Sequence, residues 1–423
     1  MARPRIVIVG GGFGGLNAAH GLAGAPADVT VIDGRNYHLF QPLLYQVATA
    51  GLSPAQIASP IRGILRDGAN VRVILGKVSG VDRERRTVIL EEGELGTRSV
   101  EYDILVLATG ARHAYFGHDD WESVAPGLKT IDDATAIRRR ILTAFERAEQ
   151  VDDPAERRRL LTFVVIGGGP TGVEMAGAIA ELAHVALQRD FRVVNPREAR
   201  IVLVESGPRV LGAFPEVLST AALRSLERLH VEVRLGKPVT HCDEAGVTID
   251  GEPLAAATIV WAAGVASSPA AQWLGVDKDK VGRVMVGPDL AVPGHPDIFV
   301  IGDTAHVAGP DGQPIPGLAP AAKQQGAYVA RLLRARLSGR KPPPPFRYRN
   351  YGSLSTIGRR AAVADFGWLK LDGTLAWLAW SLIHVSFLIG FRNRLVVMLD
   401  WIWAYITFQS GARLITGAES RRA

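Results

Sequence analysis

Short apolar runs that stop at glycine-rich turns recur along the chain. The run "RIVIV" (5–9) leads into "GGGFGGLNAAHGLA", and the run "TFVVI" (162–166) leads into "GGGPTGVEMAGAIA". A short apolar run before a glycine turn is typical of a buried parallel strand, and the small-residue stretch that follows predicts a helix. A second apolar run follows each helix, ending at Asp33 in "DVTVID" and at Glu205 in "RIVLVE". The pattern therefore predicts the same strand, turn, helix and strand twice.

Both turns have the spacing GxGxxG, at Gly10, Gly12 and Gly15 and again at Gly167, Gly169 and Gly172. The first glycine of such a turn allows a tight bend, the second lets a pyrophosphate approach the backbone, and the third lets the helix pack on the strand. The phosphates then lie at a helix N-terminus, where free N–H groups favour negative charge. A carboxylate at the end of the second strand accepts hydrogen bonds from an adenosine ribose, which is the role expected of Asp33 and Glu205. The sequence therefore predicts two dinucleotide sites.

Three further strands favour a flavin at the first site. The runs "YDILVLATGA" (102–111), "TIVWAAGV" (258–265) and "PDIFVIGDTA" (296–305) end in small residues, which permit close approach of the backbone to a cofactor. Asp303, near the end of the third run, could bind ribityl hydroxyls or reach the pyrophosphate through water. The alternative is that Asp303 caps a helix that starts in "TAHVAG". The long gap between the second glycine turn and Glu205 predicts an extended helix or a long loop.

The single cysteine, Cys242, excludes a disulfide within the chain and a CxxC redox pair. We expect its thiol to be inert and partly buried. The histidines include no HExxH or other metal-ligand spacing, so no metal site is expected. The sequence passes from "MARPR" straight into a strand without an apolar signal region, which favours a cytosol-like compartment.

The excess of positive charge lies in residues 341–423, which hold eleven Lys and Arg against four Asp and Glu. After the stiff spacer "KPPPP" comes an apolar run, 374–391, that has no charged residue and leads into "RNR". Five of the eight tryptophans lie from Trp368 onward, and Trp and Arg within long apolar runs favour a membrane interface over nucleic acid. Because His384 and Asp400 interrupt the apolar pattern, two helices lying in one leaflet are favoured over a spanning hairpin. The alternative is that these helices form ordinary core or a dimer interface.

Several stretches resemble the type II NADH:quinone oxidoreductases, which are flavoproteins with two dinucleotide-binding domains: "NYHLFQPLLYQVATAGLSP" (36–54), "GGGPTGVEMAGAIAEL", "IGDTA" and "LAPAAKQQG". The resemblance implies an α/β fold in which a Rossmann-like FAD domain is interrupted by a Rossmann-like NADH domain. The expected boundaries are 1–115 and 282–340 for the FAD domain, 116–281 for the NADH domain and 341–423 for a membrane-associating helical region. The implied activity is hydride transfer from NADH to FAD and electron transfer to a membrane quinone, without proton pumping. The implied location is the cytoplasmic face of the plasma membrane, as a peripheral protein, and a homodimer is left open.

The resemblance also implies the residues of the site. Contacts with FAD are expected at Gly12, Gly15, Asp33, Thr109, Gly110 and Asp303, and contacts on the NADH side at Gly169, Gly172, Glu174 and Glu205. Further cofactor contacts are expected at Gly10, Phe13, Gly14, Gly34, Arg35, Gly167, Pro170, Thr171, Gly264, Gly302 and Ala319. The catalytic residues that the resemblance implies are Glu174, Lys323 and Gln324.

Some of these positions have a second interpretation. Glu174 lies either beside the nicotinamide and flavin or on the first turn of its helix, where an acid complements the helix dipole. Many relatives read A-Q-x-A-x-Q where this chain has "APAAKQ", so that Pro320 replaces a glutamine and Lys323 replaces an apolar residue. Lys323 then either lines the quinone site or is an exposed helix residue. The alternative functions are a soluble NAD(P)H:ferredoxin or diaphorase-type reductase, which needs no Trp- and Arg-rich tail, and an NADH-sensing flavoprotein that regulates a partner.

Overall fold

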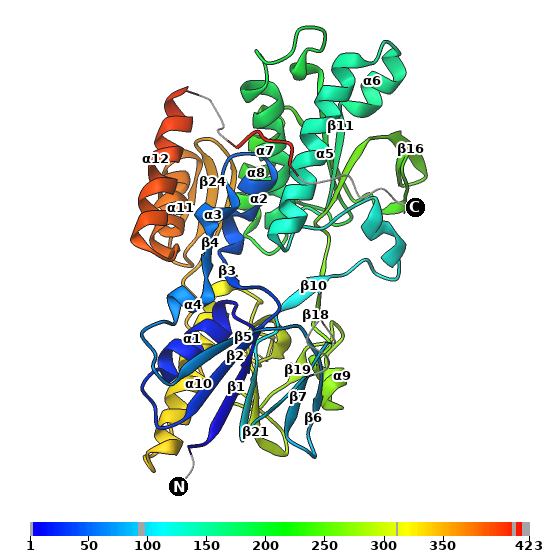
Figure 1. Ribbon diagram of the computed structural model, residues 1–423. Coiled ribbons are helices and arrows are strands. Elements are labelled where there is room, and N and C mark those ends of the chain that lie inside the picture. The colour runs from blue at the N-terminus through cyan, green and yellow to red at the C-terminus, as the bar shows by residue number, and fades with distance from the viewer. Residues whose placement is uncertain (1–2, 92–97, 310–311, 408–411, 417–423) are drawn as a thin grey trace. The chain divides into compact units, whose positions relative to one another are not determined.

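The computed structural model describes residues 3–91, 98–309, 312–407 and 412–416, which form an α/β fold (Figure 1). The chain forms two compact units. The first unit comprises residues 1–39, 58–112 and 265–351, and the second comprises 40–57, 113–264 and 352–423. Residues 408–411 and 417–423 of the predicted membrane-associating region lie outside the described residues.

A six-stranded sheet forms the centre of the first unit, in the order β20-β21-β9-β1-β2-β5. Its strands are β1 (Arg5–Val9), β2 (Asp28–Asp33), β5 (Val71–Leu75), β9 (Ile104–Leu107), β20 (Ala291–Val292) and β21 (His295–Val300). All neighbours are parallel except β20, which runs antiparallel to β21. The apolar side chains of β1 and β9 are buried, as expected for strands covered on both faces.

Helices α1 (Phe13–Leu22) and α10 (Ala319–Leu337) pack closely against each other (Figure 1). The contact depends on small residues, because a Cβ atom at Gly326 would overlap the backbone carbonyl of Gly14. The remaining elements of the first unit are β3 (Tyr37–Leu39), β4 (Ala58–Pro60), α4 (Ile61–Ile64), β6 (Val78–Asp82), β7 (Thr87–Leu90), β8 (Ser99–Glu101), α9 (Ala270–Leu274), β19 (Val284–Met285), η5 (Gly302–Thr304) and β22 (Ala305–His306). Strands β10 (Ala111–His113) and β18 (Val265–Ser267) lie where the chain passes from one unit to the other.

The second unit contains a four-stranded parallel sheet in the order β13-β12-β11-β17. Its strands are β11 (Thr162–Ile166), β12 (Arg200–Glu205), β13 (Val231–Leu235) and β17 (Thr258–Trp261). Helix α7 (Pro170–Glu181) follows β11, and a one-turn π-helix, η3 (Leu182–Ala186), extends it into the long loop that the sequence predicted before β12. Helix α5 (Ile131–Gln150) begins at a capping box in which Thr130 and Asp133 each accept a hydrogen bond from the other's backbone N–H.

The other elements before residue 353 in the second unit are η1 (Gln41–Leu43), α2 (Leu44–Ala48), α3 (Pro54–Ile57), η2 (Asp119–Ser123), α6 (Pro154–Leu160), η4 (Pro196–Glu198), α8 (Glu216–Arg228), β14 (Val239–Cys242), β15 (Gly246–Ile249) and β16 (Glu252–Ala255). Strands β14, β15 and β16 form a separate antiparallel sheet.

The C-terminal part adds a three-stranded antiparallel sheet, β23 (Ser353–Gly358), β24 (Ala361–Asp365) and β25 (Lys370–Asp372), and two helices, α11 (Gly373–Phe387) and α12 (Phe391–Thr407). Helix α7 packs directly on β23, because a Cβ atom at Gly177 would overlap the carbonyl of Ile357. Helix α11 packs on β24, and α11 and α12 lie side by side (Figure 1).

These contacts divide the chain differently from the predicted domain boundaries. Residues 265–281, predicted with the NADH domain, belong to the first unit, and residues 40–57, predicted with the FAD domain, belong to the second. Of the predicted C-terminal region, residues 341–351 belong to the first unit, and the part that begins with β23 joins the unit that contains the second glycine turn, where β23 packs on α7. Such packing between distant segments is not encoded in the local pattern of apolar residues.

Candidate functional site

The first glycine turn, between β1 and α1, has the shape that a pyrophosphate requires. Gly10 has φ +105°, and a Cβ atom there would overlap the carbonyl of Ala108. A Cβ atom at Gly15 would overlap the carbonyl of Gly10, which shows how closely the helix returns to the strand. Gly12, the N-cap of α1, has no atom within 4 Å of its Cβ position, and the first helical turn has no acidic residue. The turn therefore presents open backbone and a helix N-terminus to an anion, and it fits a dinucleotide.

The second glycine turn repeats this geometry. Gly167 has φ +110°, with its Cβ position 2.6 Å from Ala262, and a Cβ atom at Gly172 would overlap the carbonyl of Gly167. Gly169, the N-cap of α7, again has nothing within 4 Å of its Cβ position. Pro170 occupies the first turn of α7, where its missing N–H costs no hydrogen bond, and Thr171 next to it is exposed. Both predicted turns therefore fit dinucleotide phosphates.

The two acids at the strand ends hold the glycine turns in place. Asp33 accepts hydrogen bonds from the backbone N–H of Gly11 at 2.6 Å and of Arg35 at 2.7 Å. Glu205 accepts in the same way from the backbone N–H of Gly168 at 2.5 Å and of Gly207 at 2.6 Å. The sequence did not predict that both carboxylates hold the backbone of the glycine turns. A carboxylate has acceptor sites beyond these two bonds, so ribose binding by either acid stays a prediction.

The ends of β9 and β21 meet beside the first turn. The Thr109 hydroxyl lies 2.5 Å from the Ser268 hydroxyl and 3.2 Å from that of Thr304. Gly110, at φ +71°, accepts hydrogen bonds from the Ser268 backbone N–H and the Thr304 hydroxyl. Ser268 and Thr304 were not predicted, because only the tertiary structure brings three hydroxyls from distant segments to one place.

Asp303 lies inside the short helix η5, whose N-cap is Ile301. The segment after it forms strand β22, so the alternative interpretation of Asp303 as a helix N-cap is wrong. The Gly302 N–H donates a 2.6 Å hydrogen bond to the side chain of Gln325, a buried residue of α10 that the sequence analysis missed. The loop that carries Asp303 is thereby fastened to α10.

Helix α10 begins at Ala319, with Pro320 in its first turn, where proline is tolerated. Lys323 is partly buried, and its charge adds to the effect of burial in lowering the pKa of His38. The alternative interpretation of Lys323 as an exposed residue is therefore wrong. The Gln324 amide pairs with the backbone of Arg349, donating to its carbonyl at 2.9 Å and accepting from its N–H at 3.0 Å. Gln324 therefore tethers the segment after α10, and a quinone contact for this residue stays a prediction.

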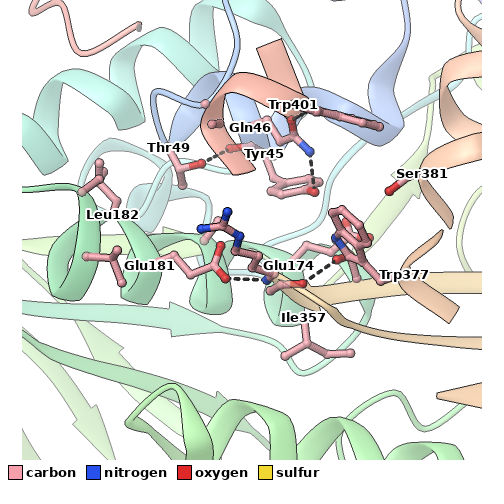
Figure 2. Close-up of a pocket in the computed structure, with 18 of the residues that line it drawn as sticks. Tyr45, Gln46, Thr49, Glu174, Glu181, Leu182, Ile357, Trp377, Ser381 and Trp401 are labelled. Carbon is pink, nitrogen blue, oxygen red and sulfur yellow. Dashed lines mark hydrogen bonds between the residues drawn. The ribbon is translucent and has the colours of Figure 1, made fainter. Parts of the chain in front are cut away.

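A cavity of about 220 Å³ lies within the second unit, between α2, α7, β23, α11 and α12 (Figure 2). Its walls combine polar side chains from the first three elements with aromatic rings from the last two. The residues that matter for its chemistry are Tyr45, Gln46, Glu174, Glu181, Trp380 and Trp401. Of these, only Glu174 was predicted.

Two acids of α7 face this cavity from positions two helical turns apart, so they share one face of the helix (Figure 2). Glu174 as a residue keeps some exposure, but its carboxyl group is buried. This burial raises the pKa of Glu174 to about 8, although the Thr356 N–H and the Ser355 hydroxyl act to lower it. Burial also raises the pKa of Glu181, which accepts a hydrogen bond from the Arg359 backbone. Because α7 begins at Pro170 and has no acid in its first turn, the helix-dipole interpretation of Glu174 is wrong.

Polar residues of the apolar tail have specific partners. Asp400 of α12 accepts a hydrogen bond from Gln56 of α3, so it anchors the helix instead of interrupting it. Burial lowers the pKa of His384 to about 4, which leaves the ring uncharged, stacked on Trp380 at a centroid distance of 4.4 Å. The tail thus has a core-facing side, in part agreement with the alternative that it forms ordinary core.

The opposite side of the tail exposes large apolar side chains. They are Leu375, Leu378, Leu382 and Phe387 on α11, and Phe391, Leu395, Met398, Leu399, Ile402, Trp403 and Ile406 on α12. No helix among the described residues combines the length and the apolar character needed to cross a bilayer.

Cys242 lies in the core of the second unit with 4% of its surface exposed, and burial raises the pKa of its thiol to about 12. The thiolate is therefore scarce at neutral pH, as expected for an inert cysteine. Gly264 lies at the chain's exit from the second unit, where its carbonyl accepts a hydrogen bond from the Ala114 N–H. Gly34, beside Asp33, is exposed.

Two dinucleotide turns on parallel sheets, without a thiol pair, define the class: a flavoprotein oxidoreductase of the two-dinucleotide type. The sequence model of the pyridine nucleotide-disulphide oxidoreductases matches residues 4–326, and the model of the NDH2 C-terminal domain matches 351–408. The chain is 45% identical to the type II NADH:quinone oxidoreductase NdhA of Mycobacterium tuberculosis, over 98% of this chain and 90% of that protein. It is 44% identical to Ndh of the same organism, over 99% and 91%. The chain belongs to the type II NADH:quinone oxidoreductases.

A solved structure supports the fold. NDH2 from Plasmodium falciparum, in complex with NADH, matches with a TM-score of 0.89 over 98% of this chain and 100% of that one, at 21% identity. The predicted α/β fold with two dinucleotide-binding domains and C-terminal helices is thus confirmed.

Proposed function

We propose that this protein oxidises NADH with FAD as its cofactor and reduces a quinone in the cavity between α7 and the C-terminal helices. Bound FAD supplies the chemistry, since a flavin accepts a hydride from a nicotinamide and passes the electron pair to an acceptor. The observation that carries the proposal is the cavity itself, in which a proton-carrying acid lies under aromatic side chains of the tail.

The chain's own residues bind and orient the two cofactors. The turn Gly10–Gly15 and the N-terminus of α1 hold the FAD pyrophosphate, while Asp33 holds both the turn and the ribose. Further flavin contacts come from Thr109, Gly110, Gly302, Asp303 and Ala319. The turn at 167–172 and the N-terminus of α7 hold the NADH pyrophosphate, with Glu205 on the ribose.

Glu174 supplies the proton that the overall reaction consumes. Oxidation of NADH by a quinone Q follows NADH + H⁺ + Q → NAD⁺ + QH₂, so one proton per turnover must come from the protein or from water. With a pKa of about 8, Glu174 is mostly protonated at neutral pH and can donate to a quinone oxygen. Water then restores the proton.

The exposed apolar side of α11 and α12 lies on the membrane surface. The exposed apolar residues of these two neighbouring helices bind within a single leaflet, and the exposed Arg392 in the first turn of α12 favours anionic headgroups. A lipophilic quinone then reaches the cavity from the bilayer, because the same two helices form one wall of the cavity. The cytoplasmic face of the plasma membrane is the location that we infer, and a homodimer stays a prediction.

An anaerobic titration followed by addition of an acceptor tests the function. The flavin absorbance of the purified protein should bleach with NADH and return with a short-chain quinone, and steady-state turnover should saturate in both substrates. A flavin that bleaches with NADH but is not reoxidised by quinone would favour the diaphorase or sensor alternatives. A flavin that NADH fails to bleach would overturn the proposal altogether.

A further inference from the structure

A chain of hydrogen bonds shows that the Tyr45 hydroxyl does not donate to its neighbour Gln46 (Figure 2). The Trp401 indole N–H donates to the Gln46 side chain at 2.8 Å, and the Gln46 side chain contacts the Tyr45 hydroxyl at 2.8 Å. An indole nitrogen can only donate, so the Gln46 atom facing Trp401 must be the carbonyl oxygen. The Gln46 amide NH₂ therefore faces Tyr45 and donates to its hydroxyl oxygen. The hydroxyl proton must point elsewhere.

Tyr45 is buried, with 6% of its surface exposed, and it lines the cavity together with Glu174 and Glu181. Burial raises the pKa of Tyr45 well above its ordinary value, and the charges of Glu174 and Glu181, which line the same cavity, act in the same direction. Within the described part of the chain, no residue accepts a hydrogen bond from the Tyr45 hydroxyl. A buried donor without an acceptor is unfavourable, so a ligand that carries an acceptor would satisfy it.

The rest of the cavity suits a planar ring that carries a carbonyl group. Trp380 and Trp401 are stacked in its wall, with ring centroids 5.4 Å apart. A volume of about 220 Å³ exceeds the ~150 Å³ of a cavity that holds benzene in another protein. Of the polar groups present, Tyr45 is a neutral donor across the acidic range and up to high pH, since its pKa is raised.

We propose that Tyr45 donates a hydrogen bond to a carbonyl oxygen of the quinone, and that Gln46 and Trp401 are positioning residues that keep this hydroxyl pointing at the substrate. The inference rests on the proposed function, because it concerns the acceptor of that reaction. Without the Trp401 N–H, the Gln46 amide can rotate and present its oxygen to Tyr45. The Tyr45 hydroxyl would then donate its hydrogen bond to Gln46 instead of to the quinone.

The arrangement couples the tail to the quinone site. Trp401 and its neighbour Asp400 fasten α12 to the segment 44–57, through Gln46 and Gln56 respectively. Helix α12 also carries the exposed apolar residues proposed to contact the membrane. Quinone binding therefore depends on the position of α12, because the helix that carries the membrane-facing residues also carries the Trp401 N–H that orients Gln46.

Two conservative substitutions, Tyr45→Phe and Trp401→Phe, test the proposal in the FAD-loaded, full-length protein. Each removes one hydrogen-bonding group and keeps the ring. With a short-chain quinone in detergent, the KM for quinone should rise about tenfold in both variants, while NADH oxidation by ferricyanide, which has no carbonyl, should stay within about twofold. Trp273→Phe, a partly exposed tryptophan of α9, is the matched control and should leave both activities unchanged.

A double-mutant cycle separates positioning from general loss of structure. Because Trp401 acts through Tyr45, the double variant should have the quinone KM of Tyr45→Phe alone. The inference is overturned if the increases in quinone KM of the two single variants multiply in the double variant. It is also overturned if Tyr45→Phe leaves the quinone KM unchanged. If Trp401→Phe loses FAD, Gln46→Met replaces it, with the same expected KM and the same lack of additivity with Tyr45→Phe. Failure of the proposed function is distinguishable, because the unmodified protein would then show no quinone turnover at all.

Discussion

The pKa of Glu174 gives the proposed function its most demanding test. Burial raises this pKa from 4.5 to about 8, so at pH 7 about nine in ten molecules carry the proton. Glutamine in place of Glu174 keeps the size of the side chain but cannot give up a proton to the substrate. We therefore expect Glu174→Gln to lower quinone turnover at pH 7 by about 10² or more, the usual effect of losing a general acid.

The pH dependence carries the sharper signature. In the unmodified protein, quinone turnover should fall as the pH rises through about 8 and Glu174 loses its proton, and this alkaline decline should be absent from the residual activity of the variant. The ferricyanide rate should show no such decline in either protein, because ferricyanide takes up no proton. The other titratable groups that line the cavity are Tyr45, Glu181 and Arg359. His384, which stacks on Trp380 of the cavity wall, is uncharged above a pKa of about 4. If the alkaline decline persists in Glu174→Gln and disappears in Glu181→Gln, the decline belongs to Glu181, and our reasoning about Glu174 is refuted.

Stability should change with pH in a direction that burial dictates. The folded-state pKa of Glu174 lies above its unfolded value, so between about pH 4.5 and 8 the folded protein holds a proton that the unfolded chain has released. This group therefore makes the protein less stable as the pH rises through that range. The full effect, reached above pH 8, is at most about 5 kcal/mol. Glu174→Gln should raise the unfolding temperature at pH 9 and change it little at pH 4.5, as measured by thermal melts followed through flavin fluorescence.

Further outcomes follow from other parts of the structure. NADH should be preferred to NADPH by more than about tenfold, because Glu205 repels a 2′-phosphate, and Glu205→Gln should narrow this gap in kcat/KM; equal use of both nucleotides by the unmodified protein would exclude the assignment. Cys242→Ala should keep FAD and at least half of the quinone rate, and a loss beyond tenfold with flavin bound would revive a thiol mechanism. Gly177→Ala should lower the unfolding temperature, since its Cβ atom would overlap the Ile357 carbonyl and part α7 from β23, and an unchanged melt would contradict this packing. Leu382→Gln with Ile402→Gln should release the protein from liposomes while ferricyanide reduction survives, and full retention on the liposomes would rule out this face as the membrane contact.

The sequence alone determined the elements around the cofactors. The glycine turns were predictable because their requirements are local: a positive φ at Gly10, an open Cβ position at Gly12 and a close return of the helix at Gly15 all lie within six residues. The alternation of apolar strands and small-residue helices likewise predicted the parallel sheets. The stretch containing Tyr45 and Gln46 was recognisable as characteristic of the family, although nothing in it indicated what either side chain does.

The tertiary structure decided which side chains meet. Asp400 looked like an interruption of an apolar helix because its partner, Gln56, is 344 positions away along the chain. Of the two interpretations of Glu174, the first-turn acid was excluded only by the structure, which begins α7 at Pro170 and buries the carboxyl group beside Ser355 and Thr356 of β23. The cavity joins segments from Tyr45 to Ala404, and the charge state of its acids depends on burial by all of them. Burial and long-range hydrogen bonds are properties of the packed chain, and no local pattern of residue types specifies them.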